Sequence, residues 1–167
     1  MKLGLLPVGS TVFADANVLA YHFTKVMPLA SVCTSFLRRA ASGEIRVITS
    51  SLVVAEVIHR AIVFEAAMTL SIPREELITH LKNHPDVVRG LSQHLGIVSE
   101  LARMKVDIKP VDHVNLHGSK RFRQDYGFMT NDSLVLAVMK RHKVIHLATN
   151  DRDFERVPEI KVWAPKI

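Results

Sequence analysis

The stretch FADANVLAYH, residues 13–22, indicates the architecture of this chain, because an apolar, β-prone run ends there at a carboxylate, Asp15. Three more apolar stretches each carry an acid: VVAEVIHR around Glu56, MTNDSLVLAV around Asp132 and LATNDRDF around Asp151. A carboxylate is costly to bury unless its charge is compensated, and several converging carboxylates repel one another. The four acids therefore indicate a bound metal cation.

Outward from these acids, strand-like and helix-like periodicities alternate along the chain. The expected strands are residues 11–14, 46–49, 107–111, 144–148 and 161–163. The expected helices are residues 29–41, 52–68, about 130–143, and a hairpin around residues 73–104 whose second arm is one helix from about residue 86. Residues 113–126 fit either a helix or a loop. Strands separated by helices predict an α/β fold: a three-layer α/β/α sandwich with a mainly parallel central sheet of about five strands.

Caps and chain length complete the predicted architecture. Ser50 or Ser51 is expected to cap the helix that follows it, and Thr130 or Asn131 the later one. The 167 residues suffice for one well-packed core, so we expect a single domain over residues 1–167.

The four acids fall where such a fold would bring ligands together. Parallel sheets bind ligands at the carboxyl ends of their strands, and Asp15 and Asp151 each follow a strand. Asp132 lies in the first turn of a helix and Glu56 inside an apolar one. Considered alone, Asp132 is explained better by helix capping than by metal binding, and Glu56 is explained better by a salt bridge to Arg60. These separate explanations account less well than a metal site for the occurrence of all four acids.

The net charge and the cysteine count indicate which binding partners and which cellular compartment suit this chain. Lys and Arg outnumber Asp and Glu by 22 to 16, a net charge of +6 that favours a polyanionic partner or simply keeps the protein soluble. Cys33 is the only cysteine, which excludes a disulfide framework and a thiolate metal site and suits a reducing compartment, by default the cytoplasm. We expect no signal peptide, and charged residues such as Glu56, Arg60 and Glu65 exclude a membrane span in residues 52–70.

The order of the four acids, with Asn17 after the first and TNDRDF at residues 149–154, resembles the PIN domain family. The resemblance runs from about residue 12 to residue 163. It implies a compact α/β/α sandwich and, in many members, metal-dependent ribonuclease activity. The family includes the toxin halves of VapBC toxin–antitoxin pairs, so it also implies RNA as a substrate and a small antitoxin protein as a candidate partner.

The resemblance carries roles over to particular residues. The implied catalytic acids are Asp15, Glu56, Asp132 and Asp151. The implied metal ligands are Asp15, Asp132 and Asp151, with Glu56 and Asp153 as further candidates. Asp153 can supplement or replace Asp151, and Glu56 can bind the metal or deprotonate the attacking water. Asn17 and Thr149 are expected to support the site through hydrogen bonds.

The chemistry of the ligands agrees with this assignment. Carboxylate oxygens are hard donors that suit Mg²⁺ or Mn²⁺, and either one or two ions fit the number of acids. The sequence thus predicts a Mg²⁺- or Mn²⁺-dependent endoribonuclease that hydrolyses RNA phosphodiester bonds with metal-activated water, and that is a candidate toxin. The alternatives are an RNA-processing or quality-control nuclease that is not a toxin, and a noncatalytic module that retains the fold and binds RNA or protein.

Basic residues near the acids are candidates for RNA contacts. These are Lys120, Arg121, Arg123, Tyr126 and Arg152. Cations and an aromatic ring can track phosphates and stack on an unpaired base, although the same residues would also form an ordinary solvated face. The apolar helices of so small a domain further suggest a homodimer.

Overall fold

A five-stranded parallel sheet forms the centre of the computed structural model, which describes residues 1–166 except for the side chain of Arg74, so residue 167 of the expected domain lies outside the description. The strands are β1 (Thr11–Ala14), β2 (Arg46–Ser50), β3 (Asp107–Lys109), β4 (His146–Ala148) and β5 (Lys161–Trp163). They lie in the order β3-β2-β1-β4-β5, and every neighbouring pair is parallel. The predicted mainly parallel sheet is confirmed.

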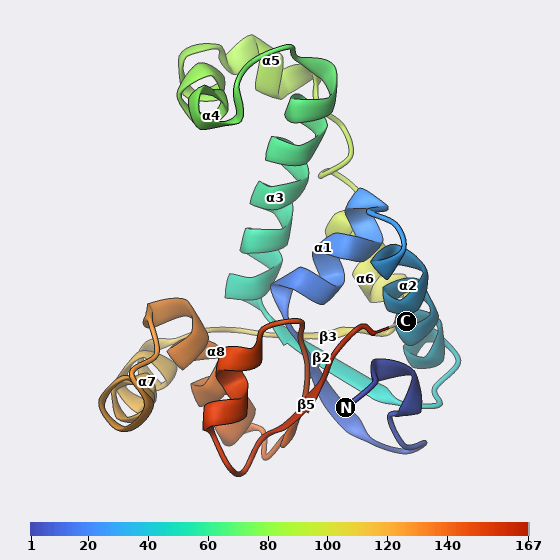
Figure 1. Cartoon of the computed structure of the whole chain (residues 1–167), viewed down its shortest axis with the longest axis vertical. Helices are drawn as coiled ribbons and strands as arrows, with labels where there is room; N and C mark the ends of the chain where they lie inside the picture. The colour runs from blue at the N-terminus through green and yellow to red at the C-terminus, as the bar shows by residue number, and fades with distance from the viewer. Residues whose placement is uncertain (167) are drawn as a thin grey trace.

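Helices cover both faces of the sheet. On one side lie α1 (Ala16–Thr24), α2 (Leu29–Ala41) and α6 (Ile97–Arg103), and on the other α7 (His113–Tyr126) and α8 (Thr130–Arg141) (Figure 1). The long helix α3 (Ser51–Thr69) projects from the sheet and carries α4 (Arg74–Asn83) and α5 (Pro85–Gly90) at its far end (Figure 1). Two short 3-10 helices, η1 (Leu3–Leu5) and η2 (Arg152–Arg156), complete the chain. Within residues 1–166, every helix is too short or too polar to span a lipid bilayer.

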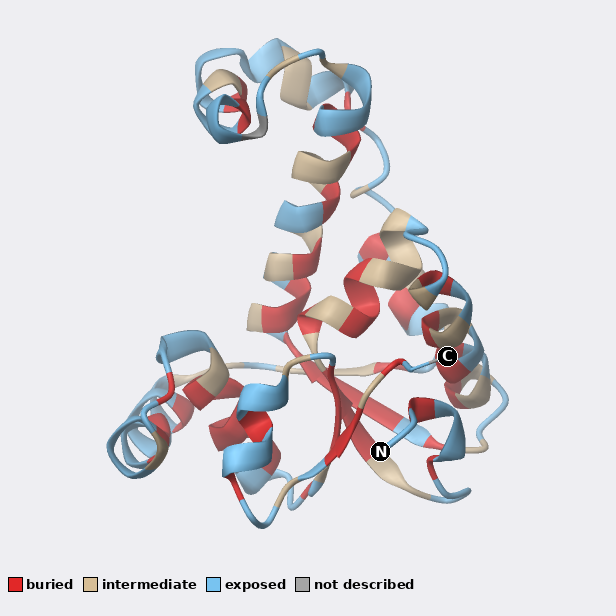
Figure 2. Ribbon diagram, viewed as in Figure 1, coloured by how far each residue is buried: buried red, intermediate tan, exposed pale blue. Residues whose placement is uncertain are grey.

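The central strand is apolar because both of its faces are covered. Val12, Phe13 and Ala14 of β1 have no exposed surface, as expected for a strand buried on both sides. Figure 2 shows the buried residues along the sheet and the inner helix faces, whereas α4 and α5 are largely exposed. Asp15 follows this strand directly, and its N–H donates to the Ala148 carbonyl at 3.0 Å. The fold therefore delivers Asp15 to the carboxyl edge of the sheet.

Helix starts differ from some of the predictions. Ser50 caps α3 as expected, accepting a hydrogen bond from the Val53 N–H at 3.2 Å. The prediction that Thr130 or Asn131 caps α8 is wrong, because the helix already includes both residues and its N-cap is Met129. Residues 113–126, for which the sequence left a helix or a loop open, form α7. Helix α1 was not predicted.

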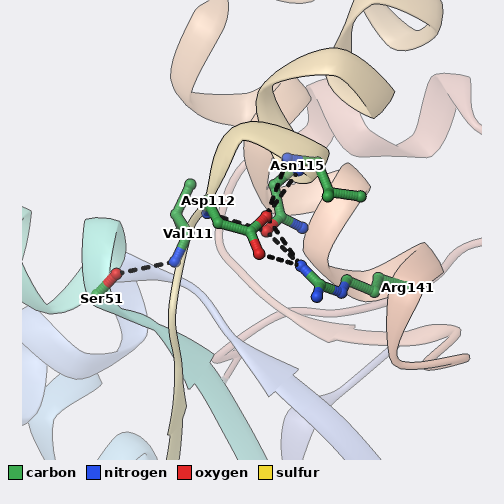
Figure 3. Close-up of polar contacts among 6 residues, drawn as sticks. Ser51, Val111, Asp112, Asn115 and Arg141 are labelled. Atoms are coloured by element: carbon green, nitrogen blue, oxygen red, sulfur yellow. Dashed lines mark hydrogen bonds and ion pairs between the residues drawn. The ribbon is translucent and has the colours of Figure 1, made fainter.

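A polar cluster fixes the crossing from β3 to α7 (Figure 3). Ser51 at the start of α3 accepts a hydrogen bond from the Val111 N–H at 3.2 Å. Asp112 caps α7, and its two carboxylate oxygens accept from Arg141 Nη1 at 2.9 and 2.8 Å. The Asn115 side chain accepts from the same nitrogen at 3.2 Å. These contacts join the start of α7 to the end of α8, the helix whose first turn carries Asp132.

The prediction of one continuous helix as the second arm of the hairpin is wrong. The chain forms α5 and α6 instead, separated by residues 91–96. The cause is Glu65 of α3, whose buried carboxylate accepts hydrogen bonds from the Ser92 and Gln93 N–H groups at 2.9–3.1 Å and so holds the backbone in a turn. Leu95, expected on an apolar stripe, is 72% exposed.

A small satellite cluster of apolar residues forms at the far end of α3, where α4 and α5 pack. Its buried members are Ala66, Leu77, Leu81 and Leu91. It is separate from the main cluster around the sheet, which reaches the lower part of α3 at Val53, Val54, Val57 and Ala61.

Glu65→Gln should destabilise the fold by about 2 kcal/mol, because the new NH₂ group faces backbone N–H donors that need an acceptor. Urea unfolding of both proteins measures this difference. Glu155→Gln is the matched control, since Glu155 is exposed, and it should unfold like the wild type. Equal stability of the wild type and Glu65→Gln would show that the Glu65 contacts do not hold residues 91–96.

Candidate metal-binding acidic site

Asp15 lies at the carboxyl end of β1 and is the N-cap of α1. Its Oδ1 accepts a hydrogen bond from the Ala16 N–H at 2.7 Å. Its Oδ2 accepts from the Asn17 amide at 2.7 Å and from the Thr149 hydroxyl at 2.6 Å. Three donors therefore hold the carboxylate in one orientation.

Thr149 and Asn17 connect Asp15 to the end of the neighbouring strand β4. The Thr149 side chain is fully buried, and its Oγ1 accepts from Asn17 Nδ2 at 2.9 Å and from the Asp151 N–H at 3.0 Å. The Asn150 N–H in turn donates to Asn17 Oδ1 at 2.9 Å. The loops that carry Asp15 and Asp151 are thus fixed to each other.

The electrostatics show that the acids lie close together. The pKa of Asp15 is raised from 3.8 to about 6, mainly by burial and also by the charges of Glu56 and Asp132, against the hydrogen bonds from Thr149 and Ala16 that lower it. Burial also raises the pKa of Asp132, followed by repulsion from Asp151, Glu56 and Asp153. Acidic side chains of α3, α8 and the loops after β1 and β4 therefore repel one another at one edge of the sheet.

Glu56 and Asp132 differ in how their charge is compensated. The Glu56 salt bridge that the sequence suggested is confirmed, with Arg60 Nη2 and Glu56 Oε1 2.5 Å apart. The capping explanation of Asp132 is wrong, because α8 has Met129 as its N-cap and no side-chain cap. Among residues 1–166, the side chain of Arg74 apart, no group donates a hydrogen bond to the half-buried Asp132 or forms an ion pair with it.

The last two acids also have different environments. Asp151 is half-buried, and its Oδ1 accepts from the Asp153 N–H at 2.8 Å. The Asp153 side chain is 65% exposed and pairs with Arg156, with Asp153 Oδ2 and Arg156 Nη2 2.7 Å apart. Asp151 also raises the pKa of Asp132 more than Asp153 does. Of these two acids, Asp151 therefore has the stronger electrostatic interaction with Asp132.

Arg156 connects η2 to the segment before α8, a role that sequence reasoning missed. Its guanidinium lies 4.7 Å from the centre of the Phe128 ring and donates to the Tyr126 carbonyl at 3.3 Å. Its Nε donates to the Asp153 carbonyl at 3.0 Å. The sequence shows that Arg156 lies near the last acidic motif. It does not indicate the contacts of Arg156 with Tyr126 and Phe128, which lie about 30 residues earlier in the chain.

The candidate RNA-contact residues fall into two groups. Lys120 and Arg152 are exposed, and neither forms an ion pair or side-chain hydrogen bond in the part of the chain that the structure describes. Arg121 pairs with an acid one turn later at 3.1 Å, and Arg123 donates to two serine hydroxyls of α7 and α8 at 2.7 and 3.1 Å. Tyr126 packs against two phenylalanine rings, each with centroids 6.5 Å away.

The donor set fits a hard divalent cation. Every candidate ligand is a carboxylate, and the two acids whose pKa is raised, Asp15 and Asp132, are those whose charge a cation would offset. Among residues 1–166, no three His, Cys, Asp or Glu side chains lie close enough to enclose one ion by themselves. A Mg²⁺ ion commonly takes only one or two protein carboxylates, with water completing its shell.

Comparison with known proteins identifies the family. The PIN domain family matches residues 12–160. The chain belongs to the PIN domain family. Among curated proteins, none matches this chain at a significant level.

Three solved structures with a similar fold are a VapBC2 complex, a toxin–antitoxin complex and a toxin. VapBC2 of Rickettsia felis, bound to a promoter DNA fragment, has 18% identity and a TM-score of 0.57 over 92% of this chain and 98% of its own. A Klebsiella pneumoniae toxin–antitoxin complex has 18% identity and a TM-score of 0.55 over 94% and 98%. The VapC20 toxin of Mycobacterium tuberculosis, which cleaves the sarcin–ricin loop, has 16% identity and a TM-score of 0.57 over 86% and 92%. At these identities the likeness establishes the fold.

Protonation of Asp15 should stabilise the metal-free protein. Because its folded pKa of about 6 exceeds the ordinary 3.8, the protonated carboxyl favours folding below pH 3.8, and this contribution is lost as the pH rises to about 6. Urea unfolding in EDTA between about pH 4 and pH 7 should therefore show a fall in stability that is smaller in Asp15→Asn.

Asp112→Asn is the matched control for this pH series, since Asp112 is also a helix N-cap but Arg141 lowers its pKa. This variant should keep the Asp15-dependent fall. The interpretation fails if wild type and Asp15→Asn lose the same stability over the series.

Proposed function

We propose that this PIN domain protein is a divalent-cation-dependent endoribonuclease that hydrolyses RNA phosphodiester bonds, with Mg²⁺ or Mn²⁺ as its cofactor. The observation that supports it best is Asp132: a half-buried carboxylate with no hydrogen-bond or ion-pair partner among the described side chains, whose pKa is raised by burial and by three neighbouring acids, against the charge of Arg156. A carboxylate left without a partner in this way is costly, and a cation offsets the cost.

Asp15, Asp132 and Asp151 hold the cation in this proposal, either directly or through water. A bound divalent cation stabilises charge on a phosphate and acidifies water. Thr149 and Asn17 orient Asp15 by donating to its Oδ2, whereas Oδ1 accepts only from the Ala16 N–H, so that a lone pair on Oδ1 remains available for the ion or its water. Asp151 is preferred to Asp153, because Arg156 already pairs with Asp153.

Glu56 takes the role of positioning and deprotonating the attacking water. Two observations support this role: Arg60 forms an ion pair with the Glu56 carboxylate, and the charge of Glu56 raises the pKa of both Asp15 and Asp132. A carboxylate within hydrogen-bond reach of water can act as a general base. Lys120 and Arg152 supply exposed positive charge for the RNA phosphates.

A toxin role and its partners extend the proposal. Similarity of fold to toxins in toxin–antitoxin complexes supports a small antitoxin protein as a partner, and we further propose a homodimer. We also propose a cytoplasmic location, because a chain with a single cysteine, Cys33, suits a reducing compartment. The Cys33 side chain is buried, and burial raises the pKa of its thiol to about 12.

Asp15→Asn should lower metal-dependent RNA cleavage by about 100-fold or more, since even residues that only support metal ligands contribute 10- to 100-fold. Cleavage of a labelled RNA with Mg²⁺, Mn²⁺ or EDTA measures this, and EDTA should abolish the activity of the wild type. Asp112→Asn, again an Asp at a helix N-cap, should cleave like the wild type.

Two outcomes would contradict the nuclease proposal. One is wild-type-like cleavage by pure, folded Asp15→Asn protein. The other is RNA binding that is independent of metal with no turnover of any RNA, which would indicate a noncatalytic module.

Expression of the wild type in bacteria should arrest growth if the nuclease is a toxin, and Asp15→Asn should not. Co-expression of the cognate antitoxin should restore growth, as measured by culture density after induction. Metal-dependent cleavage without growth arrest would instead favour an RNA-processing nuclease.

A further inference from the structure

An apolar pocket of about 280 Å³ lies away from the acidic site. Its walls come from α7, α8, the turn before β4 and the segment before β5. The acids follow the carboxyl ends of the strands, whereas Val144, Ile145, Glu159 and Ile160 of the pocket precede the amino ends of β4 and β5. None of the five candidate acids lines it, so the pocket is a separate site.

The inner wall of the pocket is hydrocarbon and aromatic. It is made by Phe122, Tyr126, Leu136, Val144, Val157 and Ile160. Leu136 and Val157 are only 1% and 2% exposed, so they belong to the rigid core and the pocket has a preformed floor. Its volume is near the lower end of the roughly 300–1,000 Å³ typical of small-molecule sites. The apolar wall favours an aryl or alkyl group, because a polar group buried against it would lack hydrogen-bond partners.

Positive charge surrounds this apolar interior. Arg121, Lys140 and Lys143 contribute to the lining, against a single acid, Glu159. Arg121 forms an ion pair with Asp125, but Lys140 and Lys143 are exposed and form no ion pair with any of the side chains that the structure describes. An apolar ligand that also carries a negative charge would therefore match both parts of the pocket.

We propose that this pocket binds a small apolar anion: an aryl or alkyl group that enters the hydrocarbon interior and bears one carboxylate or sulfonate facing Lys140 and Lys143. The apolar group supplies most of the affinity through burial, and the anion fixes its orientation at the rim. Because the pocket shares no residue with the acids, binding does not depend on the proposed nuclease activity.

The test is a fluorescence titration of the full chain with 1-anilinonaphthalene-8-sulfonate, compared with the uncharged N-phenyl-1-naphthylamine. The wild type should bind the sulfonate saturably at one site, and methyl resonances of Leu136, Val144 and Ile145 should shift in NMR spectra. The double variant Lys140→Gln/Lys143→Gln should weaken sulfonate binding by about fivefold, as expected for two exposed charges, and leave the neutral probe unaffected. Ile145→Trp should weaken both probes, because the larger ring of this 43% exposed rim residue can fill the pocket.

Lys82→Gln/Lys105→Gln is the matched control. Both lysines are exposed, Lys82 lines a different apolar pocket, and Lys105 has the same left-handed backbone as Lys143, with φ of 57° and 56°. This control should bind the sulfonate like the wild type. The proposal is overturned if the wild type shows no saturable binding, if the control and the Lys140→Gln/Lys143→Gln variant lose equal affinity, or if folded Ile145→Trp binds both probes unchanged.

Discussion

The carboxylate of Asp15, held between the ends of the two central strands, is the interaction on which the rest of the site depends. Burial favours its neutral form and is the main reason why its pKa is raised to about 6, although the hydrogen bonds from Thr149 and Ala16 act in the opposite direction. The hydrogen bonds from Ala16, Asn17 and Thr149 also fix the geometry of the carboxylate. The same threonine holds the Asp151 N–H, so one buried hydroxyl sets the relative position of two acids.

Charge compensation in the site decreases from its edge to its centre. Glu56 and Asp153, at the edge, have arginine partners in Arg60 and Arg156. Asp132 has none in the part of the chain that the structure describes, and Asp15 has only neutral donors. A protein that needed these acids only for stability would gain from pairing the central ones as well. Their arrangement favours an added cation at the centre over a purely structural network.

Much of the framework could be predicted from sequence, because a sheet buried on both faces requires continuous apolar runs. The runs that became β1 and β5, and the helix that became α2, were predicted with the observed bounds. The predicted single helix after residue 86 failed because one buried side chain, Glu65, binds the backbone of residues 92 and 93 from another helix. Periodicity is a local signal and cannot include such a contact.

In the candidate site, too, local sequence patterns predicted some features, whereas contacts between distant residues could not be predicted. The acids could be selected from sequence because each interrupts an apolar run, but their partners could not. Asp132 looked like a helix cap until the helix was seen to begin at Met129, and Arg156 had no signal for its contact with Phe128. From sequence, Asp153 could also supplement or replace Asp151, whereas in the structure Asp153 differs from Asp151 by its ion pair with Arg156.

The central claim is that the acids of the carboxyl edge hold a divalent cation, and anomalous diffraction from crystals soaked in Mn²⁺ tests it most directly. The account predicts a manganese peak between Asp15 and Asp132, within direct or water-mediated reach of Asp151, that disappears in Asp15→Asn crystals. A well-ordered wild-type crystal with no manganese at these acids, or an unchanged peak in Asp15→Asn, would contradict it.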